Sequence, residues 1–214
     1  MEELAETEKI ILEIVREYLD KNRQFNLGDI IPFISSRLRA TQLNLNYRGI
    51  KGILKSLLDK KFLIEGSKLS HRDILENEKR KVIYEYILNH PGTYFNKIVS
   101  DLDFSNHVVV WHLSMLLKFN FIKKTIIEGH ETYSDLKISD IKTHFHYVVS
   151  KKKSKLIINY LERNYLGVTK TELASKLKIH INTISKFLEK LQELNIIKTE
   201  IIDKKRLYFL KSKM

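Results

Sequence analysis

Small polar and basic side chains gather in two short stretches near the end of the chain. The first stretch holds Asn182, Thr183, Ser185 and Lys186, and the second holds Lys204, Lys205 and Arg206. Amide, hydroxyl and ammonium groups hydrogen-bond to base edges and to phosphate oxygens. Adjacent cations at a turn pair with phosphates or enter an A·T-rich minor groove. Both stretches point to contact with a nucleic acid, although lysines at a turn are also commonly just solvated.

Two earlier stretches are weaker candidates for the same chemistry. Arg48, Lys51 and Lys55 recur at helical spacing, which places three cations on one helix face. The other stretch consists of Asn106, His107 and Trp111, the single tryptophan of the chain. An exposed indole can pack on a sugar–phosphate backbone or anchor a protein interface, and both interpretations remain open. The alternative for the three cations is an ordinary solvated face.

Patterns typical of catalysis and of metal binding are missing from the sequence. It contains no glycine-rich phosphate loop, no paired-carboxylate motif and no Ser-His-Asp pattern. His144 and His146 stand two residues apart without an evident third ligand, and there is no cysteine. His112 falls beside a buried helix face, which favours a packing role. We therefore predict neither an enzyme nor a metal site, and no cofactor.

Positive charge is concentrated in the last third of the chain. The net charge is +12 and the isoelectric point is about 9.6. Residues 135–214 contain 18 Lys and Arg against 8 Asp and Glu, whereas residues 1–66 and 67–134 each carry a net charge of only +1. Such an excess favours a polyanionic partner, either a nucleic acid or an anionic membrane surface. Lysine-rich codon usage is the alternative, but a uniform bias would not leave two thirds of the chain near neutral.

The sequence predicts a cytoplasmic protein without membrane contact. No apolar run approaches the ~20 residues that a membrane-spanning helix needs. Three of the first six residues are glutamates, unlike the basic start of a secretory signal.

An internal repeat determines the predicted architecture. A shift of 75 residues brings residues 79–134 onto residues 154–209 without a gap, and 13 of the 56 positions are then identical. Composition alone would give roughly four identities. The identities include Gly92 and Gly167, which fall in predicted loops. Two unrelated amphipathic helices would match only along their apolar faces, so the two segments are copies of one module.

Each copy changes its hydrophobic period in the same order. In the later copy the predicted elements are a helix over 153–163, a short helix from Lys170, a third helix that buries Ile184, Leu188 and Leu191, and strands over 196–202 and 207–210. The earlier copy repeats this order from a helix over 79–89. Two helices, a turn, a third helix and a hairpin form a winged helix-turn-helix. The predicted fold is mainly α with small β-hairpin wings (α+β), arranged as tandem winged helix-turn-helix domains.

Four segments follow from this repeat. We expect a looser winged-helix-like first copy over 1–66, a second copy over 67–134, a linker helix within 135–152 that starts at Ser139 and Asp140, and a basic third copy over 153–214. In the first copy, helices are expected over 3–20, 27–39 and 46–60. Its hairpin is truncated after Gly66.

Residues 102–113, Leu-Asp-Phe-Ser-Asn-His-Val-Val-Val-Trp-His-Leu, resemble the recognition helix of ArsR/MarR-like winged-helix regulators. Residues 66–78, followed by Asn-His-Pro-Gly at 89–92, are similar to archaeal regulators with several winged-helix units, among them the activators of the euryarchaeal archaellum operon. The resemblance covers most of residues 46–210. It implies an archaeal, sequence-specific transcription factor, often a homodimer, that acts on double-stranded DNA and the transcription machinery.

The functional prediction is a duplex-DNA-binding transcription regulator that uses recognition helices and a basic wing. The second copy departs from this pattern, because its wing tip at 128–131 is acidic and would be repelled by phosphate. His180 also stands where the second copy has Ser105, so which copy contacts bases stays open. One alternative is a protein adaptor or scaffold that binds through Trp111 and the acidic wing. A structured-RNA binder is a weaker alternative.

Overall fold

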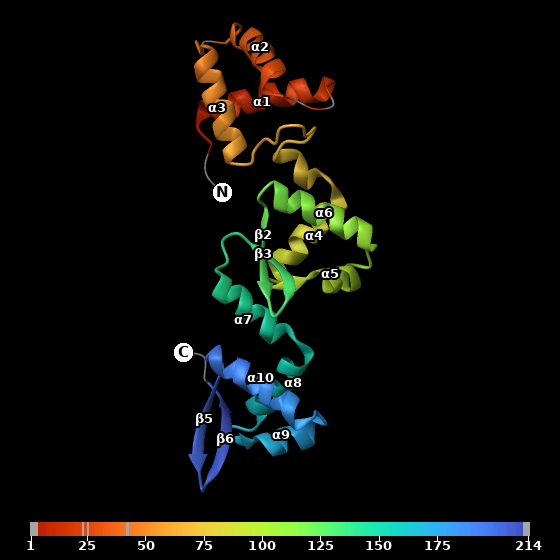
Figure 1. The fold of residues 1–214 in the computed structure, drawn as a ribbon, viewed down its shortest axis with the longest axis vertical. Coiled ribbons are helices and arrows are strands. Elements are labelled where there is room, and N and C mark those ends of the chain that lie inside the picture. The colour runs from red at the N-terminus through yellow and green to blue at the C-terminus, as the bar shows by residue number, and fades with distance from the viewer. Residues whose placement is uncertain (1–3, 23, 25, 42, 212–214) are drawn as a thin grey trace. The chain divides into compact units, whose positions relative to one another are not determined.

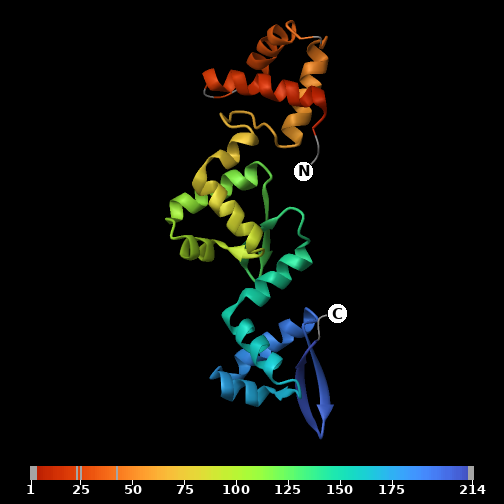
Figure 2. The same cartoon turned by 180° about the vertical axis from the view of Figure 1, so that it is seen from behind.

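The computed structural model describes residues 4–22, 24, 26–41 and 43–211, which are mainly helical with two small antiparallel sheets (Figures 1 and 2). This confirms the predicted α+β class. The chain divides into two compact units: unit 1 is Met1–Asn89 with Phe95–Lys124, and unit 2 is His90–Tyr94 with Thr125–Met214. The four segment boundaries stay predictions, and their ends at 1–3 and 212–214 lie outside the described residues. Among the described helices, none has the length and hydropathy of a membrane span.

Unit 1 begins with three helices close to the predicted spans: α1 (Glu6–Lys21), α2 (Leu27–Leu38) and α3 (Tyr47–Asp59). Asn26 and Asn46 cap α2 and α3, because each side chain accepts a hydrogen bond from the backbone N–H three residues later. The apolar faces of the three helices share one core, which contains Ile11, Ile34 and Leu54.

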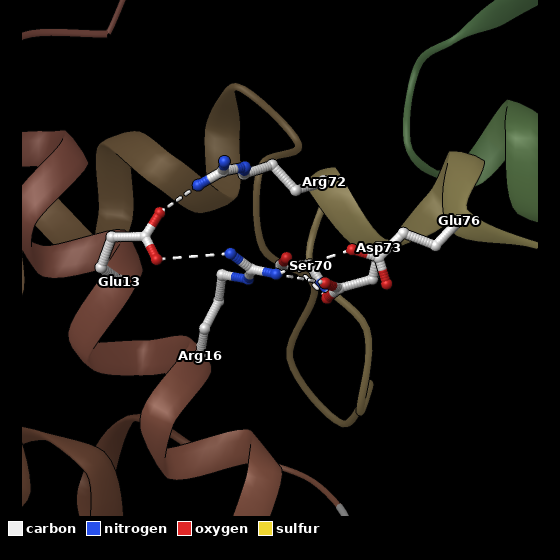
Figure 3. A network of polar contacts seen from close by, with 6 residues as sticks. All are labelled: Glu13, Arg16, Ser70, Arg72, Asp73 and Glu76. Atoms are coloured by element: carbon white, nitrogen blue, oxygen red, sulfur yellow. Dashed lines mark hydrogen bonds and ion pairs between the residues drawn. The ribbon is translucent and has the colours of Figure 1, made fainter.

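The remaining elements of unit 1 are the 3₁₀ helix η1 (Arg72–Glu76), α4 (Glu78–Asn89), α5 (Phe95–Leu102), α6 (Asn106–Lys118) and the start of β2 (Ile122–Ile127). Ion pairs tie η1 to α1 (Figure 3). Arg16 of α1 contacts Asp73 at 3.1 Å and Glu13 at 3.3 Å. Glu13 also pairs with Arg72. Asp73 accepts hydrogen bonds from the backbone N–H and the hydroxyl of Ser70, so the segment before α4 is held against α1.

Unit 2 contains β1 (Thr93–Tyr94), the rest of β2, β3 (His130–Asp135), α7 (Asp140–Ser150), α8 (Lys152–Arg163), β4 (Val168–Thr169), α9 (Lys170–Leu177), α10 (Ile181–Glu193), β5 (Ile197–Ile202) and β6 (Lys205–Leu210). The sheet orders are β1-β3-β2 and β4-β6-β5. The sequence did not predict β1 and β4, because two residues are too few to show a period. The helix α7 begins at Asp140 with Ser139 as its N-cap, as predicted, and its Tyr147 and Val148 are buried in the core that α8 and α10 share.

The third helix ends in the same way in each of the three predicted copies. Each of α3, α6 and α10 has 13 residues, and each is followed by a residue with φ near +60°: Lys61, Asn120 and Asn195. The next backbone N–H donates back to the carbonyl five residues earlier, as from Phe62 to Leu57 at 2.9 Å. The equivalent bonds in α6 and α10 are also 2.9 Å long. This Schellman motif satisfies the last carbonyls of the helix and turns the chain towards the hairpin.

The hairpin of the first copy is truncated, as predicted. Residues 61–71, all of them described, contain no strand. The bond that would close the hairpin is nevertheless present, because the His71 N–H donates to the Phe62 carbonyl at 2.9 Å. In the third copy the equivalent bond runs from Lys211 to Ile196, also at 2.9 Å. The first copy therefore keeps the base of a wing without its strands.

The gapless alignment of the repeat is wrong over the first helix of each copy. α4 buries Arg80, Ile83 and Ile87, whereas α8 buries Ser154, Ile157 and Leu161. These positions correspond at a shift of 74 residues, and so do the helix ends. The connection before Gly167 is one residue longer, which restores the shift of 75. Only burial distinguishes a shift of 74 from one of 75 in this helix, because neighbouring aliphatic residues align with one another at both shifts.

A buried carboxylate joins α1 to α3 in unit 1. Glu8 is 6% exposed, and it accepts hydrogen bonds from Lys60 at 2.9 Å and from Ser56 at 2.6 Å. The backbone N–H of Ala5 donates to it as well. Hydrogen bonds from Lys60, then Ser56 and Ala5, lower the pKa of Glu8 from 4.5 to about 2.

We expect Glu8→Gln to lower the stability of unit 1 at neutral pH and to remove part of its pH dependence. The folded pKa lies below the unfolded one, so the ionised carboxylate contributes stability above pH 4.5 that is lost as the pH falls towards about 2. Urea unfolding at several pH values measures this. The control is Glu6→Gln, which removes an exposed carboxylate from the same turn. Parallel pH profiles for the Glu8→Gln variant and the parent would contradict the assignment.

Candidate nucleic-acid interface

The outward face of α10 carries the polar residues predicted from the sequence. Asn182 and Lys186 are exposed, while Thr183 and Ser185 are half-buried at the edges of the face. Ile184, Leu188 and Leu191 are buried on the opposite side, as predicted, and this fixes the rotation of the helix. His180 caps α10, since its Nδ1 accepts a hydrogen bond from the Asn182 N–H at 3.2 Å. The face is therefore presented by a capped, well-packed helix.

The wing of the third copy is the hairpin of β5 and β6, which extends from the helices in both views (Figures 1 and 2). Ile202 pairs with Lys205, so Asp203 and Lys204 form a two-residue turn. All three predicted cations, Lys204, Lys205 and Arg206, are exposed at this tip. The wing tip thus exposes three cations to solvent, one in the turn and two in the first residues of β6.

Lys204 has an unfavourable backbone conformation. Asp203 and Lys204 have φ values of +48° and +62°, as a type I′ turn requires. Aspartate tolerates the left-handed region, but a side chain such as lysine costs about 1–2 kcal/mol there. The second wing has the same turn with Glu128 and Gly129, so glycine occupies the position of Lys204. The third wing keeps a cation where glycine would be more stable.

The predicted residues of the second copy lie on α6. Asn106 and His107 are exposed, and Trp111 is 51% exposed, which confirms that the indole is not in the core. The buried guanidinium of Arg80 lies 5.1 Å from the Trp111 ring, and it donates a hydrogen bond to the Ile74 carbonyl at 2.7 Å. Arg80 therefore forms a cation–π contact with the indole, and the sequence did not predict this contact.

His112 is packed within unit 1, as predicted. It is 4% exposed. Burial lowers the pKa of His112, and the charges of Arg80 and Lys79 lower it further. The imidazole is accordingly neutral at physiological pH and adds no charge to the surface of α6.

The cations of the first copy lie together on α3. Arg48, Lys51 and Lys55 are all exposed, as their spacing predicted. Gly52 lies between them, and a Cβ atom built on it would have no neighbour within 4 Å. This face therefore combines three cations with an open stretch of helix backbone.

Glu128, one of the two acids at the tip of the second wing, forms two ion pairs within unit 2. Glu128 contacts Lys151 at 2.5 Å and Lys190 at 2.6 Å. Partial burial raises the pKa of Glu128, but the hydrogen bonds and charges of the two lysines lower it overall. Sequence reasoning expected this tip to repel phosphate and missed both lysines, because no local pattern links residues so far apart in the chain. A run of lysines at 151–153 was the available signal.

Comparison with known proteins shows a distant similarity to a transcriptional regulator. Over 144 residues, or 66% of this chain, the sequence is 26% identical to an uncharacterised HTH-type transcriptional regulator of Methanocaldococcus jannaschii. The chain spans about a third of that protein's length (36%). No protein-family model matches the chain. The similarity supports the broad group of HTH-type regulators, and the finer archaeal subgroup stays a prediction.

We expect Lys204→Gly to raise the free energy of unfolding by about 1 kcal/mol, because glycine adopts a positive φ without steric cost. The matched control is Lys205→Gly, which removes a cation from the adjacent residue in β6. That control should lower stability, since glycine is unfavourable within a strand. Urea unfolding measures both changes. A Lys204→Gly variant no more stable than the parent would show that the turn is unstrained.

Proposed function

We propose that the chain is a sequence-specific, duplex-DNA-binding regulator of transcription built from tandem winged helix-turn-helix copies. The observation that carries the proposal is the third copy, which combines the polar outward face of α10 with a cationic wing tip. Lys204 supports it most directly, because a strained lysine at an exposed tip suits a polyanionic partner better than it suits the fold. The name of the distant archaeal relative supports the same class of function.

In this proposal α10 enters the major groove and the wing contacts the flanking backbone. The Asn182 side chain is suited to adenine, because its amide N–H can donate to adenine N7 while its amide oxygen accepts from the N6 amino group. The Lys186 ammonium is suited to guanine O6 and N7. Thr183 and Ser185 at the edges of the face fit phosphate or base edges. The wing cations supply attraction that does not depend on sequence.

Duplex binding measured across a salt series tests the proposal. We expect log affinity to fall linearly with log salt, by about 0.9 for each phosphate contacted. The triple variant Lys204→Ala, Lys205→Ala, Arg206→Ala should reduce this slope by up to about 2.7. The proposal fails if the parent has no duplex affinity at low salt and the triple variant behaves like the parent.

Lys204→Gly separates binding from folding. It removes one wing cation while relieving the strained turn, so it should fold at least as stably as the parent yet bind duplex with a slope smaller by about 0.9. A loss of binding in this variant cannot come from unfolding. Unchanged binding would place the wing tip away from phosphate.

A protein adaptor is the second candidate, and α6 favours it. Val110 and Trp111 are 56% and 51% exposed side by side, and exposed aromatic and aliphatic side chains anchor protein interfaces. The side chains of Val110 and Trp111 are equally able to contact a thymine methyl group or a deoxyribose, so their exposure alone does not decide between protein and DNA.

The emission of Trp111 distinguishes these two partners. Because it is the single tryptophan, its fluorescence reports on α6 alone. We expect duplex to quench this fluorescence in proportion to binding, and the triple wing variant to shift the titration to higher DNA concentration. Saturated duplex binding without any change in emission would exclude DNA from α6 and favour the adaptor role for this helix.

A further inference from the structure

Two lysines of unit 2 converge on one carboxylate. The Lys151 Nζ lies 2.5 Å from one oxygen of Glu128, and the Lys190 Nζ lies 2.6 Å from the other. Lys151 is the N-cap of α8, Lys190 belongs to α10, and Glu128 lies at the tip of the hairpin of β2 and β3. Two ammonium groups that share one anion constitute an anion-binding site. Its occupant here is a side chain of the same protein.

In the first copy, the equivalent contact between the first and third helices contains an acid of the first helix itself. There, Glu8 accepts hydrogen bonds from Ser56 of α3 and from Lys60, the C-cap of that helix. Ser56 and Lys190 are the same position of the 13-residue third helix. By the burial pattern, Glu8 corresponds to Ser154 of α8, whose buried hydroxyl has no hydrogen-bond partner among the described residues. The third copy therefore has a lysine at the position of Ser56 and no acid at the position of Glu8.

The start of α8 accumulates further cations. Lys152, Lys153 and Lys155 are exposed, and none of them forms an ion pair within the described part of the chain. A helix N-terminus carries partial positive charge, so lysines there are unfavourable. The first turn of α1 carries two acidic residues instead, and α4 begins with Glu78 ahead of three cations. An external polyanion would offset this unfavourable charge at the start of α8.

We propose that Lys151 and Lys190 form a phosphate-binding site for duplex DNA, and that Glu128 occupies it until a phosphate displaces the carboxylate. This inference rests on the proposed DNA-binding function. Lys190 lies one turn after Lys186 on α10, so the site adjoins the outward face at the place where the flanking backbone would run. The three side chains are between 24% and 33% exposed, which leaves them accessible from solvent.

The displacement lowers the affinity for every duplex. Any DNA must first compete with Glu128, so contacts to the backbone gain less free energy at this site. Because the same two ion pairs are broken whatever the DNA sequence, specific and non-specific binding are weakened by the same factor and their ratio is unchanged.

Glu128→Gln tests the site directly. We expect this variant to bind duplex roughly three- to tenfold more tightly, because DNA no longer has to break two partly exposed ion pairs. Glu193→Gln is the matched control, since it removes the same charge from an exposed position three residues after Lys190 on α10. A general electrostatic effect would strengthen both variants equally. Circular dichroism and thermal unfolding establish that each variant is folded.

The lysines provide a second measurement that does not depend on Glu128→Gln. Lys151→Gln with Lys190→Gln should reduce the log–log salt slope of the parent by about 1.8. The same pair of changes should abolish the gain of Glu128→Gln. An unchanged slope, or a Glu128→Gln variant that binds no more tightly than Glu193→Gln, overturns the phosphate site while leaving the proposed function intact. A parent without duplex affinity overturns both proposals together.

Discussion

The buried stripe of the third helix is the constraint on which each copy depends. In α3, α6 and α10, aliphatic side chains occupy positions four, eight and eleven of 13 residues and are at most 3% exposed. Burial of each such side chain contributes about 1.5–3 kcal/mol, so the helix cannot rotate without losing most of its packing energy. The left-handed residue that follows then sets the direction of the chain. With rotation and end both fixed, the opposite face is left to carry function.

Position six lies at the centre of that face, and there the copies differ most. It is Gly52 in α3, Trp111 in α6 and Lys186 in α10. All three are exposed, because the frame imposes the same orientation. The same position of the same helix therefore exposes backbone in α3, an aromatic ring in α6 and a cation in α10. A shared helix frame does not imply a shared ligand.

The sequence predicted the features that depend on local periodicity. Buried stripes, most helix ends and the exposure of Asn182 and Lys186 follow from where apolar residues recur. The register of the first helix was mistaken, because neighbouring aliphatic residues match equally well at two shifts and only burial distinguishes them. The two-residue strands β1 and β4 exist only through pairing with distant strands. The ion pair of Glu128 with Lys190 joins residues far apart in the chain, and no period encodes such a contact.

Two departures from local preference in the third copy involve cations. Lys204 stands where the second wing has glycine, and Lys152 stands where α4 begins with Glu78. Each departure lowers the stability of the isolated module, by strain in one case and by repulsion from the helix dipole in the other. The other copies depart from local preference as well, since Glu128 of the second wing has a positive φ and α4 continues with three cations after its first residue. The two lysines of the third copy lie in the segment with most of the net charge, where a polyanionic partner would offset both costs.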